Sequence, residues 1–308
     1  MLVYALRRFA WSIVVLLLAL LLTFALMRGI GGSPFHAAEG QDVLIPIQHR
    51  LTAYYHLDRS WPVQFATYLW HIVRFDFGPT LSIRDASVGA WIKQRVPVSL
   101  ELTGLAVALA VVLGFALGIG AALRRGRLLD RVLTTLATTL VAVPVFLFAA
   151  AGRSWLVGGL HLAGEGWGSW NARWLPVAVL ALAPAGYIAR LVRAGIIETL
   201  AQEHITVARA KGLRMRRIVL VHILPGSLTP FLTAAVPMLA LLITSAFFVE
   251  QVFGIPGAAE LFIVSAERRD YPLVLGLTTV LAVIVVYAVF LADLLAAALD
   301  VRLREARR

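Results

Sequence analysis

Cysteine is absent from the 308 residues of this sequence. The chain therefore has no disulfide framework, no thiolate nucleophile and no zinc site with Cys ligands. Acidic residues are few, since 17 Asp and Glu stand against 28 Lys and Arg, which gives a net charge of +11. In a soluble protein, such an excess of positive charge would suggest binding to nucleic acid. Here the arginines flank long apolar runs, so membrane topology explains them better and no nucleic-acid partner is expected. Lysine occurs only at Lys93 and Lys211, which we interpret as genome composition.

Several signatures of catalysis are missing as well. No G-x-x-x-x-G-K-[ST] phosphate loop occurs, so the chain should not bind and hydrolyse ATP by that route. No H-E-x-x-H occurs, and His204 and His222 lack a carboxylate placed for a zinc peptidase site, so we interpret both as solvated or interfacial. The serine turn suggested by residues 166–169 is not completed as G-x-S-x-G, which argues against an intramembrane protease. We expect no enzyme, no metal and no cofactor in this chain.

Long apolar runs dominate what is present. Hydrophobic residues make up 60% of the chain, and the mean hydropathy is +0.84. A transmembrane helix needs about 20 mostly apolar residues. The sequence therefore predicts an all-α membrane protein with six spans, at residues 9–27, 99–123, 132–152, 174–191, 227–249 and 273–299. The first run is longer than the apolar core of a signal peptide, so we expect it to remain as an anchor. Prolines that can kink these helices lie at Pro144, Pro184 and Pro237.

Arginine in the short loops predicts the orientation. Six predicted spans place the basic loop after the fourth span and the arginine-rich end of the chain on one side of the membrane. On the same side lie Arg7, Arg8, Arg124, Arg125, Arg127, Arg131 and Arg193. The positive-inside rule then places both termini in the cytoplasm. We divide the chain into an N-terminal transmembrane helix at 1–27, an external insertion at 28–98 and a five-helix core at 99–308.

Few charges lie inside the predicted spans. Asp293 is in the sixth, where a buried carboxylate is by default a functional hypothesis. It also lies near the end of the span, so we favour capping or ion pairing. Glu101 is expected at the interface, where it would favour the N-terminus of the second span. Neither residue predicts a proton relay, which argues against a proton-coupled transporter.

Small polar residues form a stripe in the third span, and tryptophans surround the loop that follows it. Thr135, Thr138 and Thr139, with Ser245 in the fifth span, are candidates to line a translocation path. Helix packing through small polar groups is the alternative that we favour for the threonines. For the tryptophans, an aromatic belt at the membrane interface explains the cluster better than a substrate cage. They are Trp155, Trp167, Trp170 and Trp174.

A long cationic loop separates the fourth and fifth spans, at residues 198–225. Residues 198–211 suit a helix with acids early and bases late, and Gly212 suits the position just after its end. Residues 213–223 then suit a second helix. The loop also contains apolar groups that a solvated loop would not expose, namely Ile205, Val207, Leu213, Met215 and Ile218. We expect it to dock on a partner, with binding to anionic lipid as the alternative.

Residues in this loop and elsewhere resemble a known family. The loop's "ARAKG", followed by "HILP", resembles the EAA loop of the membrane subunits of bacterial ABC importers. The subfamily it resembles is the dipeptide/oligopeptide permeases of the DppB/OppB type. Other matching segments are "LDRSWPVQFATYLWHIVRFDFGPTLS", "VPVSLEL", "VEQVFGIPGAAELFIVSAERRDYPLV" and "LADLLAAALDVRLR". Among the departures, Phe75 precedes Asp76 where this subfamily usually has glycine.

The resemblance implies the fold, the partners and the site. The fold would be a type I ABC importer transmembrane domain in the bacterial cell membrane. The partners would be a second permease, two cytoplasmic P-loop ATPases and an external solute-binding protein. The loop would be a coupling helix on an ATPase, formed by Glu203, Ala208, Arg209, Ala210, Lys211, Gly212 and Leu213.

Three points stay open in the sequence. Substrates in this subfamily include peptides, nickel complexes, haem and sugars, and we favour di- or oligopeptides. A self-contained channel or secondary transporter is the alternative function. In the external insertion, Trp61-Pro62 predicts the start of a helix in a cap that contacts the solute-binding protein. Its predicted apolar face is Tyr68, Leu69, Ile72 and Val73.

Overall fold

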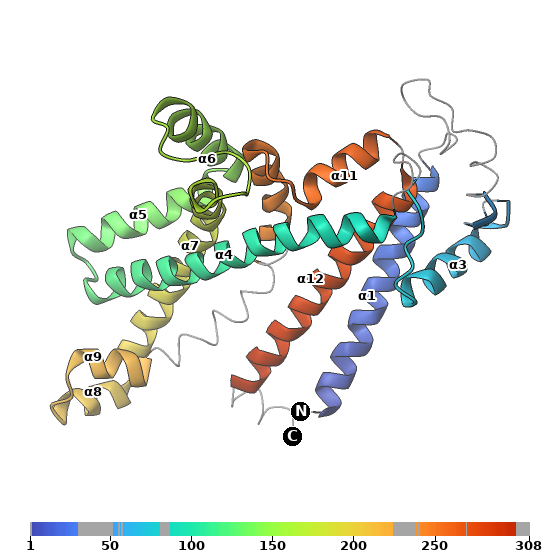
Figure 1. The fold of residues 1–308 in the computed structure, drawn as a ribbon. Helices are drawn as coiled ribbons and strands as arrows, with labels where there is room; N and C mark the ends of the chain where they lie inside the picture. Colours follow the sequence, from blue (N-terminus) through green and yellow to red (C-terminus); the bar gives the residue numbers. More distant parts are fainter. Residues whose placement is uncertain are drawn as a thin grey trace. The chain divides into compact units, whose positions relative to one another are not determined.

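In the computed structural model of the protein, the described residues are 2–29, 52–54, 56, 58–80, 87–223, 238, 241–268 and 270–299. Within these ranges the regular structure is helical, and the single β-bridge joins Pro79 to Ser87 (Figure 1). The chain divides into two compact units. The first holds residues 1–5, 100–255 and 288–308, and the second holds residues 6–99 and 256–287.

In the part of the chain that the structure describes, four helices are long and apolar enough to cross a membrane: α1 (Leu2–Gly29), α4 (Val88–Leu123), α7 (Trp170–Leu200) and α12 (Tyr271–Leu299). Two bent pairs raise the number of possible spans to six. One pair is α5 (Leu128–Ala142) with α6 (Val145–Gly152) and the π-helix η1 (Arg153–Gly159). The other is the helix Leu241–Phe253 with α11 (Ala258–Glu267). This agrees with the six predicted spans, although residues 227–237 of the fifth lie outside the described residues.

Proline has different effects in two of these helices. The predicted third span is not one straight helix, because the chain bends by 95° between α5 and the segment Val145–Gly159, which is α6 with η1. Val143 leaves the helical region with ψ 124°, since a residue before proline is sterically driven toward extended backbone and Pro144 follows it. Pro184, also predicted as a possible kink, lies inside the continuous helix α7.

The predicted start of the second span lies too late in the sequence. We expected it from residue 99, but α4 begins at Val88. Lys93 and Arg95 hide this start in the sequence because they interrupt the apolar run. In the structure Arg95 Nη1 lies 2.9 Å from Glu260 Oε2 in α11, so its charge is paired. Predicted span four was likewise too short at both ends, since α7 covers Trp170–Leu200.

Small residues bring α4 and α7 close together in the first unit. A Cβ added to Gly114 would lie 2.6 Å from Ile188 Cβ and 2.9 Å from the Ala185 carbonyl oxygen, so a larger residue does not fit. Such small-residue contacts let helix backbones approach in membranes, where there is little hydrophobic force between helices. They fix α4 against the helix that leads into the cationic loop.

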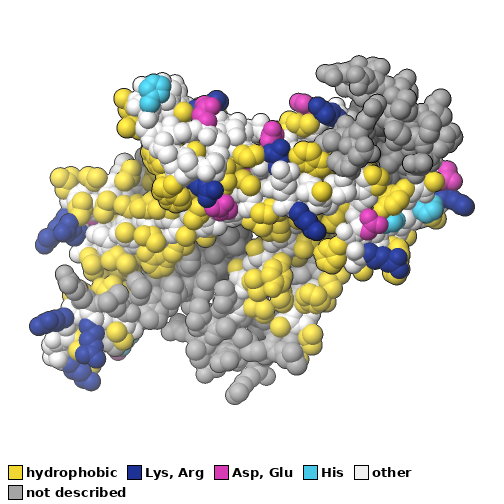
Figure 2. Space-filling model, in the orientation of Figure 1, with side chains coloured by type: hydrophobic (Ala, Val, Ile, Leu, Met, Phe, Trp, Pro, Cys, Tyr) yellow, Lys and Arg dark blue, Asp and Glu magenta, His cyan; other side chains and the backbone are white. Residues whose placement is uncertain are grey.

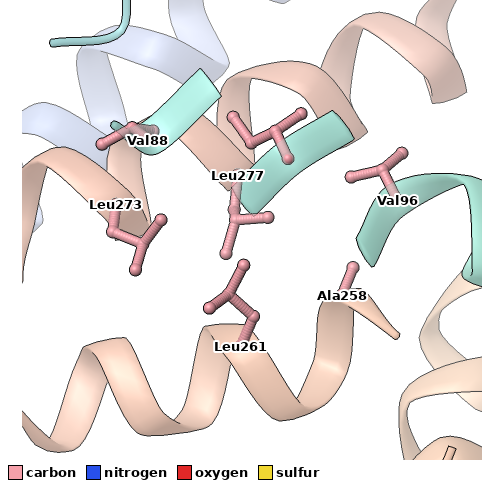
Figure 3. Packing of buried hydrophobic residues seen from close by; sticks show 7 residues of the cluster. Val88, Val96, Ala258, Leu261, Leu273 and Leu277 are labelled. Carbon is pink, nitrogen blue, oxygen red and sulfur yellow. The ribbon is translucent and has the colours of Figure 1, made fainter. Parts of the chain in front are cut away.

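The second unit has its own apolar core (Figure 3). It joins the first turns of α4 to α11 and to the start of α12, through Val88, Ile92, Val96, Ala258, Leu261, Leu273 and Leu277. Polar caps fix the helix ends beside it. The Ala258 amide at the start of α11 donates to Ser99 Oγ at 2.8 Å, and the Leu273 amide in the first turn of α12 donates to Asp270 Oδ1 at 3.2 Å.

The external insertion contains helix α3 (Trp61–Val73), which begins where Trp61-Pro62 predicted. The prediction of the apolar face of α3 was partly wrong. Tyr68, Leu69 and Ile72 are half-buried, but Val73 is 71% exposed. The buried side is centred one turn earlier, since the rings of Phe65 and Tyr68 both pack against the ring of Phe24 in α1.

Candidate functional site

The cationic loop folds into a helical hairpin at one end of α7 (Figure 1). We predicted one helix over 198–211, and this was wrong, because α7 ends at Leu200 and α8 (Glu203–Ala210) begins after a break. Gln202 is extended, with φ −80° and ψ 148°, and it occupies the N-cap position of α8. The break turns the chain so that α8 lies against η2 (Ile218–Ile223), a later segment of the same loop.

Gly212 closes the hairpin as the sequence predicts. Its φ is +75°, in the left-handed region that glycine adopts at little cost. Its amide donates to the Arg209 carbonyl at 2.9 Å, and the Leu213 amide donates to the Ala208 carbonyl at 3.3 Å. These two bonds form a Schellman motif, the common glycine termination of a helix. A Cβ at Gly212 would meet nothing within 4 Å, so the backbone conformation, not space, requires glycine here.

One face of α8 is buried inside the chain. Ile205 is fully buried and Ala208 is 7% exposed, three residues apart on the same face of the helix. This face packs on the π-helix η2 (Ile218–Ile223), which follows the short helix α9 (Met215–Arg217) and which also contacts α7. Ile218, Val219 and Ile223 of η2 are buried. The hairpin is therefore attached to the end of α7 by an apolar contact.

The opposite face of the hairpin is exposed and mixes apolar with cationic groups. Val207 is 52% exposed and Met215 is 43% exposed. Around them lie the exposed residues Arg209, Lys211, Arg214 and Arg217. Figure 2 shows these basic side chains gathered on the end of the molecule that α8 and α9 form. Of the apolar residues predicted to need cover, Ile205 and Ile218 are covered within the chain, whereas Val207 and Met215 are not.

The predicted coupling residues thus separate into two groups. Glu203, Arg209, Ala210, Lys211 and Gly212 are exposed, and Leu213 is half-buried at the turn. Ala208 points inward, so its small size serves the packing of α8 on η2.

An ion pair that the sequence analysis missed joins α7 to α5. Arg193 Nε lies 2.7 Å from Asp130 Oδ1, and Arg193 Nη2 lies 3.0 Å from Asp130 Oδ2. The same carboxylate accepts the Gly126 amide at 2.9 Å and the Thr134 hydroxyl at 3.3 Å. Asp130 is 4% exposed. The available signal was one acid in the arginine-rich stretch RRGRLLDR, which we had used for topology alone.

A second polar cluster lies at the other end of α7, among residues 101, 167 and 173. Arg173 Nη1 donates to Glu101 Oε1 at 2.7 Å, and Trp167 Nε1 donates to Glu101 Oε2 at 2.9 Å. Two predictions were wrong here. Trp167 is 6% exposed and is part of this cluster, not of an aromatic belt. Glu101 lies well inside α4, so it pairs with Arg173 and does not favour a helix N-terminus. Trp155 and Trp170, at 73% and 64% exposed, fit the belt.

Two of the candidate path residues, Thr135 and Thr139, lie on the side of α5 away from α7. α5 packs on α7 with Ala137 buried between them. Thr135, Thr138 and Thr139 are exposed, and Thr135 and Thr139 point to the side of α5 opposite Ala137. Ser245 is half-buried in the helix Leu241–Phe253. Among the described residues, no group of three or more His, Asp and Glu side chains is placed to hold a metal ion.

Comparison with known proteins identifies the family. Residues 114–305 match the family described as "Binding-protein-dependent transport system inner membrane component". The chain belongs to this family. It is 37% identical over 302 residues to the dipeptide transport system permease protein DppB of Bacillus subtilis, covering 98% of this chain and 97% of that one. It is 36% identical over 308 residues to the oligopeptide transport system permease protein OppB of Escherichia coli K12, covering 99% and 100%.

Solved structures show the fold. The MetNI methionine ABC transporter, in inward-facing conformations, has a chain that matches with a TM-score of 0.56 and 20% identity, over 68% of this chain and 96% of that one. An amino acid ABC transporter chain matches with a TM-score of 0.51 and 17% identity, over 69% and 94%. The fold is that of a type I ABC importer transmembrane domain.

Family membership gives the general function. The chain is a multi-pass membrane protein and the permease subunit of a binding-protein-dependent ABC transport system. This supports the importer prediction over a self-contained channel or secondary transporter. The family match contains the whole hairpin, α5 and α7, and therefore both the Arg193–Asp130 pair and the α8–η2 contact.

Proposed function

We propose that this chain forms the translocation path of a peptide importer together with a second, similar permease. Two cytoplasmic P-loop ATPases would drive it, and an external solute-binding protein would deliver di- or oligopeptides. Supporting this substrate class, the curated relatives are named dipeptide and oligopeptide transport proteins at 34–37% identity over nearly the full chain. Both termini lie in the cytoplasm of a bacterial cell, as the arginine distribution predicts. The chain itself needs no cofactor.

The hairpin of α8 and α9 is the ATPase-coupling element in this proposal. The observation that carries it is the division of α8 into two faces. Ile205 and Ala208 fix it to η2, while Val207, Met215 and the surrounding cations face outward. An exposed apolar patch ringed by charge is typical of a protein interface. A partner that moved α8 would move η2 and, through it, α7.

The Arg193–Asp130 pair extends this connection to α5. Since α5 also packs along α7, movement of the hairpin would displace both helices together. Rigid movement of packed helices is a known form of conformational switching. Thr135 and Thr139, on the side of α5 away from α7, would then line the path or face the second permease. Ser245 is the matching candidate on the helix Leu241–Phe253.

The first test is co-purification from the native membrane in mild detergent, with the wild-type chain and two variants. Val207→Asp places a charge on the exposed face of α8. Leu162→Asp is the control, because Leu162 is comparably exposed, at 58% against 52%, in the loop at the other end of α7. We expect wild type and Leu162→Asp to retain P-loop ATPases and Val207→Asp to lose them. A folded wild-type chain recovered without any ATPase would contradict the proposal.

The substrate class needs its own test. The co-purified complex is placed in proteoliposomes with its solute-binding protein, and ATP-dependent uptake of labelled dipeptides and oligopeptides is measured. Uptake supports the proposal. An active ATPase with no peptide uptake, together with uptake of a nickel complex, haem or a sugar, would reject peptides as substrate and leave the coupling hairpin unaffected.

A further inference from the structure

Helix α3 has a second apolar face, opposite the side that packs on α1 and α12. Its inward side holds Gln64, which is 4% exposed, with the half-buried Phe65 and Tyr68. The opposite side, at helical spacing, is apolar and exposed, and consists of Val63, Ala66, Trp70 and Val73. The helix WPVQFATYLWHIV contains no Asp, Glu, Lys or Arg. A helix surrounded by water would not be expected to have this composition on its outward face.

The contacts of α3 fix its depth along two membrane helices. Phe24 of α1, whose ring centroid lies 5.4 Å from that of Phe65, is close to the end of the candidate span Ala5–Leu26. The Tyr68 hydroxyl donates to the Leu275 carbonyl at 3.0 Å and bonds Thr279 in α12, whose candidate span is Tyr271–Leu294. At 1.5 Å per residue, Leu275 and Thr279 lie about 6 and 12 Å from the start of that span. α3 therefore lies beside the last turns of the α1 span and the first turns of the α12 span, not beyond them.

The candidate span Tyr271–Leu294 has 24 residues and is about 36 Å long, so it extends about 3 Å beyond the hydrocarbon core on each side. The Leu275 carbonyl that Tyr68 reaches is then about 3 Å inside the edge of the core, which places α3 near the boundary between headgroups and acyl chains. The hydrocarbon core is about 30 Å thick, and the whole bilayer with its headgroups is about 40–45 Å thick. A helix that packs on α1 and α12 at this level meets lipid on its opposite side. The opposite side of α1 at this level is also apolar and exposed, since Leu22 and Leu26 near its end are 60% and 57% exposed.

The side chains at the end of α3 suit the same environment. The Arg74 guanidinium carbon lies 4.2 Å from the ring centroid of Trp70, and Trp70 is 56% exposed. Tryptophan is enriched at membrane interfaces, and an arginine there can keep its charge near the headgroups while its stem stays apolar. Polar groups gather just beyond the helix, where Asp76 Oδ2 accepts the Tyr54 hydroxyl at 2.7 Å.

Phe75 adds a separate observation. Its φ is +56°, although it is neither Gly nor Asn, and its side chain is 84% exposed. The Phe75 amide donates to the Ile72 carbonyl at 2.9 Å, and the Asp76 amide to the His71 carbonyl at 3.0 Å, so α3 ends in a Schellman motif with phenylalanine where glycine is favoured. The left-handed conformation costs a non-glycine residue about 1–2 kcal/mol. An exposed aromatic ring in water offers nothing to offset that cost, whereas a ring in lipid does.

We propose that α3 is an interfacial helix whose outward face lies in the membrane leaflet on the side where α1 ends and α12 begins. Val63, Ala66, Trp70, Val73 and Phe75 contact lipid at the level of the headgroup–acyl boundary. α3 thereby holds the ends of α1 and α12 at a fixed depth. The solute-binding protein docks on other parts of the external surface.

Spin labelling tests this directly, because the chain has no native cysteine to remove. A nitroxide is attached at Ala66→Cys, a small exposed position, in the complete transporter in lipid nanodiscs. Collision rates with oxygen, which concentrates in lipid, and with a water-soluble nickel chelate are compared. Asp58→Cys is the water reference, since its side chain is 61% exposed before α3, and Leu22→Cys is the lipid reference.

We expect the oxygen-to-nickel collision ratio at Ala66→Cys to exceed that at Asp58→Cys and to approach that at Leu22→Cys. Adding purified solute-binding protein should leave it unchanged. A ratio equal to that of Asp58→Cys would overturn the proposal, because the face would be in water. A ratio that changes on addition of the binding protein would overturn it in favour of a docking surface. Val63→Cys repeats the test one turn earlier if Ala66→Cys fails to assemble.

Discussion

Arg193 and Asp130 hold α7 to the first turn of α5 through two hydrogen bonds, at 2.7 and 3.0 Å. The same carboxylate accepts the Gly126 amide in the turn between α4 and α5. One buried side chain therefore joins the ends of three helices on the side of the molecule where the coupling hairpin begins. The pair is well placed to keep α4, α5 and α7 moving together when the hairpin is displaced.

Removing the charge of Asp130 should weaken this connection. Asp130→Asn keeps the shape but leaves Arg193, 29% exposed at its side chain, without its counter-charge. We expect a loss of about 1.5–3 kcal/mol, typical of a hydrogen bond to a charged group. The functional effect should be ATP hydrolysis that continues with reduced transport. The ratio of transported substrate to ATP hydrolysed in proteoliposomes measures this, and the thermal midpoint of the complex measures stability.

The exposed pair Arg153–Glu165 provides the control. Its N–O distance is 3.0 Å, but the two side chains are 48% and 55% exposed, and such surface pairs contribute about 0–1 kcal/mol. Glu165→Gln should leave both readouts near wild type. If Asp130→Asn and Glu165→Gln behave alike, the buried pair has no special part in coupling.

Gly212 gives a prediction about conformation instead of charge. Gly212 has φ at +75° and open space where a Cβ would be added, so a substitution acts through the backbone alone. Gly212→Val should cost about 1–2 kcal/mol locally and distort the hairpin, whereas Gly212→Asn should be tolerated better because Asn enters the left-handed region more readily. We expect membrane insertion to be normal and uptake to fall for the valine variant, with the asparagine variant between it and wild type.

Gly104→Val is the matched control for added bulk. A Cβ at Gly104 also meets nothing within 4 Å, but this glycine lies within α4, where no left-handed conformation is needed. It should transport at close to the wild-type rate. Wild-type uptake by Gly212→Val would remove the hairpin turn from the coupling mechanism.

Local chemistry explains which features the sequence could predict. Gly212 and Trp61-Pro62 mark a helix end and a helix start through their own backbone preferences, and both lie where expected. The break at Ala201–Gln202 has no such marker. Gln202 is extended because Ile205 must fold back onto η2, and that contact is set by tertiary packing.

Pairs distant in sequence were beyond sequence reasoning for a related reason. Arg193 and Asp130 meet only because α5 packs along α7, and Trp167 is buried only because Arg173 and Glu101 are brought beside it. From composition alone, Arg193 was interpreted as a residue that sets membrane orientation and Trp167 as part of an interface belt. These are the usual roles of arginine and tryptophan at the ends of membrane helices. Arg193 and Trp167 depart from these usual roles because their polar atoms form hydrogen bonds with residues of another helix.

The Trp167 indole allows one of these contacts to be removed alone. Trp167→Phe deletes the hydrogen bond to Glu101 but keeps an aromatic ring near the Arg173 guanidinium, now 5.2 Å from the ring centroid. We expect a loss of thermal stability of about 1–2 kcal/mol, because a carboxylate oxygen loses its donor in a partly buried site. Trp170→Phe is the control, since Trp170 is 64% exposed, and it should change stability little. Equal effects would mean that ring size, not the Glu101 bond, matters.

Phe75 offers a prediction in which stability and membrane contact change in opposite directions. Phe75→Gly removes a strain of about 1–2 kcal/mol at φ +56°. The flexibility of glycine takes back about 0.5–1 kcal/mol. The amides of residues 75 and 76, which close the end of α3, should then exchange hydrogen more slowly, but by less than about fivefold. A backbone gain near 1 kcal/mol would give fivefold, and the lost lipid contact of the ring reduces it. At the same time the variant loses its ring from the lipid, so a spin label at Ala66→Cys should report a shallower position.

His161→Gly is the control, because His161 also has a positive φ, of 52°, but lies far along the chain from α3. It should leave exchange at residues 75 and 76 and the label depth unchanged. Faster exchange in Phe75→Gly would show that the phenylalanine ring stabilises the end of α3 by more than its backbone conformation costs.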